Sequence, residues 1–91
     1  MHFEWDDEKA ASNLLKHDVS FVEAKTVFGD PLATTVADQE HSVEEQRWIT
    51  TGMSQQQRVI VVWHTNRGAV IRMIGARPAT PQERRIYESG D

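Results

Sequence analysis

Hydrophobic and polar positions follow a helical period in the first third of the chain and a strand period in the rest. Apolar residues three or four positions apart predict a helix over residues 7–17, and Asp6 is placed to cap its first turn. A second helix is predicted over residues 21–28, because Ser20 and Glu23 form an S-x-x-E capping box just ahead of another apolar stripe.

The remainder of the chain has the pattern of strands joined by turns. Runs of β-branched and apolar residues predict strands in LATTV (32–36), RWITTGM (47–53), RVIVVWHT (58–65) and AVIRMIGA (69–76), with a shorter strand in HFEWD (2–6). Asn66 and Gly68 are both able to adopt positive φ, which predicts a tight hairpin between the last two strands. Thr80 and Glu83 form a capping box that opens a short terminal helix over residues 81–89.

This order of elements predicts an α+β fold. Residues 58–65 and 69–76 are apolar at nearly every position, so we expect central strands covered on at least one face by the two N-terminal helices. With 91 residues the chain has room for one modest core, which predicts a single domain over residues 1–91.

Charge is distributed unevenly between the two halves of the chain. Residues 1–45 carry three basic and eleven acidic residues, whereas residues 46–91 carry seven basic and three acidic ones. All seven basic residues of the second half are arginines, whose fork of donors suits phosphate and carboxylate groups. The overall net charge of −4 therefore hides a cationic half suited to a polyanion.

Several classes of protein are disfavoured by the sequence. The chain has no cysteine, its start lacks the pattern of a signal peptide, and no stretch approaches the roughly 18 apolar residues of a membrane span. We therefore expect a cytoplasmic protein without membrane contact. The histidines lack metal-site spacing and no glycine-rich phosphate loop is present, so neither a metal nor another cofactor is expected.

Arg72 interrupts an apolar strand and needs an explanation. Alternation along that strand predicts that Arg72 shares a face with Ala76. Either the side chain points into solvent, or it belongs to an arginine-lined sheet face that binds phosphate. The second interpretation gains support because Arg47 and Arg58 lie on neighbouring predicted strands and Arg77 lies at the end of this one.

The arginines near the terminal helix have two interpretations each. Arg77 precedes a helix N-terminus, where backbone N–H groups also attract anions, but a salt bridge to Glu83 would explain it equally well. Arg84 and Arg85 could contact RNA, or they could form a solvated helix face with Glu88 at ion-pairing distance along the helix.

Two further side chains are candidates on chemical grounds. His64 lies within an apolar strand, and its ordinary pKa near 6.5 would suit proton transfer, although a buried, hydrogen-bonded histidine is the commoner outcome. Trp48 could stack on a nucleic-acid base or belong to the core.

Motifs along nearly the whole chain resemble the BrnT family, toxins of type II toxin–antitoxin systems. The most specific are N-x-x-K-H-x-V-S-F-x-E-A near the start and A-R-x-A-T-x-x-E-R-x-x-Y near the end. The resemblance implies a RelE-like fold, a curved antiparallel sheet with two N-terminal helices packed on one face and a short C-terminal helix. It also implies a ribonuclease that inhibits translation and is neutralised by a BrnA-like antitoxin.

The resemblance also suggests roles for individual residues. Arg47 and Arg77 match family arginines linked to activity. Glu83, Arg84 and Tyr87 match the C-terminal motif, but their part in catalysis stays unassigned. Our hypothesis is metal-independent attack of the ribose 2′-hydroxyl on the adjacent phosphate. In this hypothesis Arg77 and Arg47 bind the scissile phosphate, Arg72 supports them, and His64 or Tyr87 transfers protons; these are the candidate catalytic residues. The candidate RNA-binding residues are Arg58, Arg84, Arg85 and Trp48.

The resemblance further implies a ribbon-helix-helix antitoxin, through which alone operator DNA is bound, and a hetero-oligomer with two-fold symmetry. Two positions depart from the expected family pattern: Gly75 replaces a common serine and Pro78 a common basic residue, which could weaken activity. The alternative function is a non-enzymatic module whose arginine-lined face grips an acidic protein or a nucleic acid.

Overall fold

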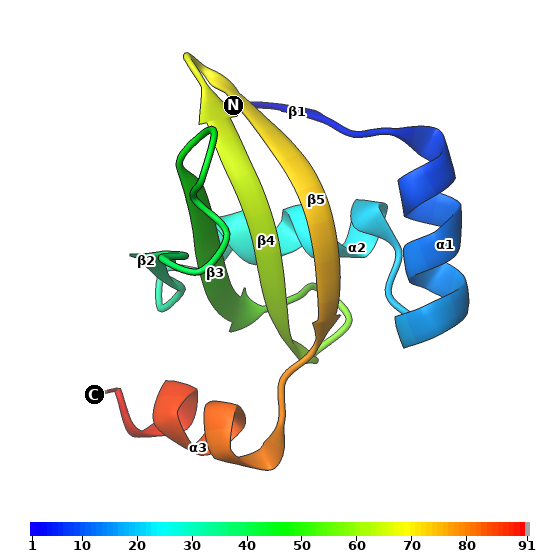
Figure 1. The fold of residues 1–91 in the computed structure, drawn as a ribbon. Helices are drawn as coiled ribbons and strands as arrows, with labels where there is room; N and C mark the ends of the chain where they lie inside the picture. Colours follow the sequence, from blue (N-terminus) through cyan, green and yellow to red (C-terminus); the bar gives the residue numbers. More distant parts are fainter. Residues whose placement is uncertain (91) are drawn as a thin grey trace.

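The computed structural model describes residues 1–90 and confirms the predicted α+β architecture. In chain order the elements are β1 (His2–Glu4), α1 (Asp7–His17), α2 (Phe21–Thr26), the 3₁₀ helix η1 (Val27–Gly29), β2 (Thr34–Ala37), β3 (Arg47–Met53), β4 (Val59–Arg67), β5 (Val70–Pro78) and α3 (Pro81–Ser89). Figure 1 shows a curved sheet with α2 crossing behind it, α1 beside β5, and α3 beyond the end of β5. None of the helices in residues 1–90 is long and apolar enough to cross a membrane.

Local signals set the starts of α1 and α3 as predicted. The Asp6 carboxylate accepts hydrogen bonds from the backbone N–H groups of Glu8 and Lys9, at 2.8 and 3.1 Å. At α3 both halves of the capping box between Thr80 and Glu83 are formed. Each bond satisfies an N–H group that has no partner within its helix, so these caps fix where the helices begin.

The capping box predicted at α2 is only half formed. The Ser20 hydroxyl accepts a hydrogen bond from the N–H of Glu23 at 3.0 Å, but the Glu23 carboxylate does not return to Ser20. It is buried instead between Arg58 and the Ser54 hydroxyl, which donates to it at 2.7 Å. A hydrogen bond between two charged groups, such as that from Arg58, is stronger than one from a neutral N–H. The Glu23 carboxylate therefore binds Arg58 instead of the N–H of Ser20.

The strand order in the sheet is β1-β5-β4-β3-β2. Strands β2 to β5 pair in the predicted antiparallel manner, whereas the edge strand β1 pairs with β5 in parallel and departs from that pattern. Gly68 provides the positive φ of the β4–β5 turn, at +63°, as predicted. Asn66 does not share this role, because it lies within β4.

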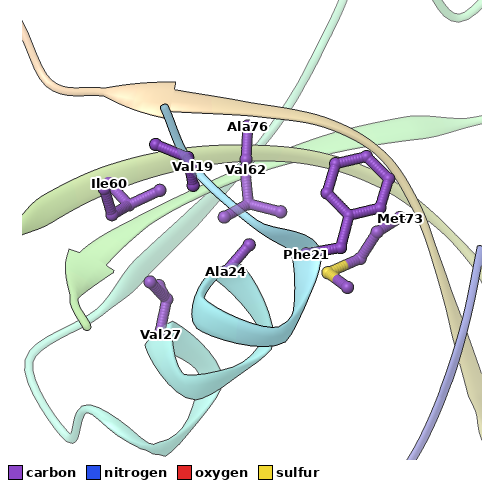
Figure 2. Packing of buried hydrophobic residues seen from close by; sticks show 8 residues of the cluster. All are labelled: Val19, Phe21, Ala24, Val27, Ile60, Val62, Met73 and Ala76. Carbon is purple, nitrogen blue, oxygen red and sulfur yellow. The ribbon is translucent and has the colours of Figure 1, made fainter. Parts of the chain in front are cut away.

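The hydrophobic core lies between α2 and the sheet. Its buried members are Val19, Phe21, Ala24, Val27, Ile60, Val62, Met73 and Ala76. Figure 2 shows the side chains of the α2 segment facing those of β4 and β5. Burial of each large apolar side chain contributes about 1.5–3 kcal/mol, so this cluster holds α2 against the sheet.

A buried side-chain amide joins α1 to the edge of the core. Asn13 Nδ2 donates to the backbone oxygens of Val19 and Ala76, at 3.0 and 2.8 Å, and Asn13 Oδ1 accepts from the N–H of Ala76 at 3.0 Å. One amide therefore satisfies three backbone groups on two separate segments.

A β-bulge interrupts the alternation of side chains along β5. In the β4–β5 register, Trp63 pairs with Gly75 and the next residue, His64, pairs with Met73, so Ile74 is the extra residue. Beyond the bulge the faces exchange, and Met73 and Ala76 both point into the core. The prediction that Ala76 shares a face with the arginine of this strand is therefore wrong.

Candidate active site

The sheet face opposite α2 gathers three of the candidate arginines. The strand register places Arg47 of β3 and Arg72 of β5 on either side of Thr65 of β4. Because the bulge exchanges the faces of β5, Arg77 also lies on this side, with its guanidinium carbon 5.1 Å from the centroid of the Trp63 ring. We call these five residues the arginine face.

Arg77 is held in one orientation by its neighbours. Its Nη1 and Nη2 donate to the two carboxylate oxygens of Glu83, at 2.7 and 3.0 Å, and Nη1 also donates to the Pro78 oxygen at 3.1 Å. The hydrogen bonds from Arg77 outweigh the effect of burial and lower the pKa of Glu83 to about 2. Both groups are therefore charged at neutral pH, and the guanidinium is fixed against the Trp63 ring.

The other two arginines, Arg72 and Arg47, differ in whether their side chains have an ionic partner. Arg72 Nη1 lies 3.1 Å from a carboxylate oxygen of Glu4 on β1, and both side chains are partly exposed. Arg47 makes no side-chain hydrogen bond or ion pair within residues 1–90. Arg47 is therefore the arginine of this face whose charge is most available to a ligand.

His64 does not lie on the arginine face. Its ring is 2 % exposed on the helix side of the sheet and makes an edge contact with Phe28, at 5.0 Å between centroids. Its Nε2 is 2.8 Å from the Thr50 hydroxyl and its Nδ1 is 2.9 Å from Asn66 Oδ1. Burial lowers the pKa of His64, so the imidazole is neutral at pH 7 and separated from the arginines by the sheet. The structure thus supports the core interpretation.

Tyr87 anchors α3 to the loop before β2. Its hydroxyl donates to Asp30 Oδ2 at 2.5 Å, and this bond raises the pKa of Tyr87 to about 12. Burial raises the pKa of Asp30, but hydrogen bonds from Met53 N–H, the Tyr87 hydroxyl and Leu32 N–H outweigh it. The pKa of Asp30 therefore lies below its ordinary value. A phenol that stays protonated and already donates its hydrogen is poorly placed to act as a general base.

Arg58 is separated from the other candidate arginines. It forms an ion pair with the buried Glu23 carboxylate, to which its Nε donates at 3.0 Å, and its Nη2 donates to the Asp18 backbone oxygen at 2.8 Å. These bonds engage the Nε and Nη2 groups of Arg58 and tie the start of β4 to α2. The structure thus gives Arg58 a structural role, and its contact with RNA stays a prediction.

Replacing Arg58 by alanine is expected to reduce the free energy of unfolding by about 2 kcal/mol at pH 7, since it leaves the Glu23 carboxylate buried without a counter-charge. Hydrogen bonds from Arg58 hold the pKa of Glu23 below 4.5, so this stabilisation is present above that pH and is lost as the pH falls. Urea unfolding at neutral and acid pH measures it. Equal losses at both pH values would contradict the pairing, and Arg58→Lys, which keeps the charge, is the control.

The remaining RNA-binding candidates lie elsewhere. Trp48 pairs with His64 and Ala37 and so points toward the helix side of the sheet, where it is partly buried. Arg84 and Arg85 are exposed on α3, and within residues 1–90 neither forms the ion pair with Glu88 that their spacing allowed. They are available to a ligand but are not part of the arginine face.

Two members of the arginine face escaped prediction from the sequence. In the sequence, Trp63 and Thr65 stand out only as parts of an apolar strand. Their spacing from Val61 does place all three on one side of β4. No local signal, however, indicated that this side faces away from the helices or that the arginines of β5 meet it there.

The two departures from the family pattern leave the backbone undisturbed. A Cβ added at Gly75 would meet only Asn13 Oδ1, at an ordinary 3.8 Å, so a serine would fit at this position. Pro78 contributes its backbone oxygen to Arg77. Among residues 1–90, no group of three histidine, aspartate or glutamate side chains converges as a metal site.

The sequence and the fold are each similar to those of known proteins. A family model described as ribonuclease toxin, BrnT, of type II toxin–antitoxin system matches residues 5–83. The chain is also similar to the 1.1 Å crystal structure of the Brucella abortus ribonuclease toxin BrnT, with 20% sequence identity and a TM-score of 0.68 over 88% of this chain and 97% of the other. No curated protein matches the sequence.

Proposed function

Since the chain belongs to the BrnT family, the ribonuclease toxins of type II toxin–antitoxin systems, we propose that its arginine face is where RNA is cleaved. The observation that carries the proposal is the position of the Arg77 guanidinium, which is fixed between Glu83 and the Trp63 ring on the same sheet face as the unpaired Arg47. Fixed donors aimed at a developing negative charge are the main catalytic device available without a metal ion.

In the proposed reaction the ribose 2′-oxygen attacks the adjacent phosphorus and the bond to the 5′-oxygen breaks. The products are a 2′,3′-cyclic phosphate and a 5′-hydroxyl. Negative charge grows on the non-bridging phosphate oxygens, and Arg77 is oriented to donate to them. Arg47 and Arg72 add positive charge on the same face, which draws the RNA strand in.

None of the three groups considered for proton transfer, Glu83, Tyr87 and His64, is well suited to it. Glu83 has a pKa of about 2, too low for an efficient base at neutral pH, while Tyr87 at about 12 is a weak acid held by Asp30. His64 is buried on the other face. We therefore propose that water exchanges the protons and that the arginines supply most of the rate enhancement.

This proposal predicts the shape of the pH–rate profile. Between about pH 5 and 8 we expect the cleavage rate to rise without the inflection that a catalytic histidine would impose. His64→Gln, which keeps a hydrogen-bonding side chain in the core, should lower stability while changing the rate of the folded fraction less than about threefold. A bell-shaped profile that His64→Gln abolishes would restore histidine as the catalytic group.

Membership of a type II family implies an antitoxin partner. We propose a BrnA-like ribbon-helix-helix protein whose acidic or aromatic segment covers Arg47, Arg72 and Arg77 and so excludes RNA. Dimerisation of that partner would give a complex with two-fold symmetry that binds operator DNA through the antitoxin. The cytoplasmic location stays a prediction.

A second candidate function is a non-enzymatic module that grips RNA or an acidic protein. It is favoured by the low pKa of Glu83, the high pKa of Tyr87 and the burial of His64, which make all three poor groups for proton transfer at neutral pH. Turnover separates the two candidates, because a binding module leaves RNA intact.

The test is to incubate the purified chain with end-labelled single-stranded RNA in EDTA and to examine the product ends. Cyclic-phosphate ends formed by the chain alone support metal-independent cleavage. Intact RNA, together with growth arrest on induced expression, would indicate that the ribosome is required. Intact RNA without growth arrest would favour the binding module.

A further inference from the structure

Thr65 occupies the centre of the arginine face and has an unusual environment. Its side chain is 1 % exposed, and its Oγ1 is the one buried side-chain oxygen or nitrogen in residues 1–90 without a hydrogen-bond partner. A buried hydroxyl without a partner destabilises a fold, so such groups are rare and call for a reason. Thr50, on the other face of the sheet, shows the usual outcome, since it bonds both Thr35 and His64.

The neighbours of this hydroxyl on either side are arginines. Arg47 on β3 and Arg72 on β5 are its direct cross-strand partners, and adjacent strands lie about 4.8 Å apart. The row therefore offers one hydroxyl donor flanked by two guanidinium groups. The carboxylate in the same row, Glu4, is bound to Arg72, whereas the Arg47 side chain makes no hydrogen bond or ion pair within residues 1–90.

We propose that Arg47, Thr65 and Arg72 form a phosphate subsite for single-stranded RNA, in which Thr65 Oγ1 donates to a phosphate oxygen. The inference rests on the proposed function and deepens it. In the free protein the hydroxyl is buried, so phosphate binding requires neighbouring side chains to move, and Arg47 is held by no hydrogen bond or ion pair within residues 1–90. The hydroxyl then donates to a phosphate oxygen the hydrogen bond that it cannot make to water while it is buried. The two neighbouring arginines attract the phosphate by their positive charge.

The subsite is distinct from the position of Arg77. Arg77 pairs with Val61, four residues from Thr65 along β4, which corresponds to about 13 Å between their backbones. The Trp63 ring lies between them and supports Arg77. The row therefore binds a phosphate that flanks the scissile one, and it contributes to substrate binding more than to the chemical step.

The experiment compares Thr65→Val, which removes the hydroxyl at nearly constant volume, with the unaltered chain on a single-stranded RNA oligonucleotide. We expect KM to rise about tenfold with kcat changed less than about twofold, the pattern of a lost ground-state contact. Thermal stability should stay equal or rise, because a buried unpaired hydroxyl is removed. Thr65→Ser should retain the KM of the unaltered chain, and Thr51→Val, on the same face outside the row, is the matched control.

Salt dependence gives a second readout that a structural role would not produce. For binding of the oligonucleotide, Arg47→Ala should reduce the slope of log affinity against log salt by about 0.7, whereas Thr65→Val should leave the slope unchanged. An unchanged KM in Thr65→Val, in a chain that cleaves RNA, overturns the subsite and leaves the proposed function standing. If the unaltered chain neither binds nor cleaves RNA and does not arrest growth on induced expression, both fail.

Discussion

Replacing Arg77 by alanine is expected to lower the rate of RNA cleavage by at least about 100-fold, the loss typical when one fixed donor to a developing oxyanion is removed. The guanidinium is held by two bonds to Glu83 and by the Trp63 ring, so its orientation is set before substrate binds. Product ends from labelled RNA, measured at saturating substrate, give the change in kcat.

Two control variants show whether the lower rate of Arg77→Ala comes from the lost guanidinium or only from a lost positive charge. Arg77→Lys keeps the charge but not the fork, and should recover only a small part of the rate. Lys25→Ala removes one positive charge from the exposed side of α2 and should cleave normally. A folded Arg77→Ala protein with the native rate would remove Arg77 from the site.

Asn13→Ala is expected to cause the largest loss of stability, about 4 kcal/mol. The substitution leaves the Val19 and Ala76 oxygens and the Ala76 N–H buried without partners, and each such group costs about 1–3 kcal/mol. It also detaches α1 from β5, next to the bulge. Since a small domain has only about 5–15 kcal/mol in total, the variant should unfold at a much lower urea concentration.

Leu15→Ala is the matched control for this prediction. Leu15 is on the same helix, is 89 % exposed and also becomes alanine, so helix propensity changes little and no buried contact is lost. Its free energy of unfolding should lie within about 0.5 kcal/mol of that of the unaltered chain. If both variants unfold alike, the Asn13 amide does not join the helix to the sheet in the way its hydrogen bonds indicate.

The sequence determined the secondary structure because its signals are local. Caps such as Asp6 and the box at Thr80 act over three residues, and the turn at Gly68 depends on one backbone angle. Strand β3 was predicted with its observed bounds, residues 47–53. The motifs also carried the resemblance to the BrnT family, which the family match over residues 5–83 confirmed.

Side-chain pairings between residues far apart in the chain could not be predicted from the sequence. Glu23 was predicted to complete a local capping box, yet its partner Arg58 is 35 residues away. Tyr87 was proposed for proton transfer, yet it donates to Asp30, 57 residues away. Many carboxylates compete for each arginine or phenol, and only the folded chain selects one by bringing it within hydrogen-bonding distance.

The composition of the candidate site was decided by the tertiary structure for one physical reason. Side chains on a strand alternate with a period of two, so a single extra residue moves everything beyond it to the other face. The extra residue Ile74 places Arg77 on the face of Arg72, over Trp63, while His64 remains in the core. The sequence by itself determined that arginines would gather near the end of the chain; the bulge in β5 determined which of them meet on one surface.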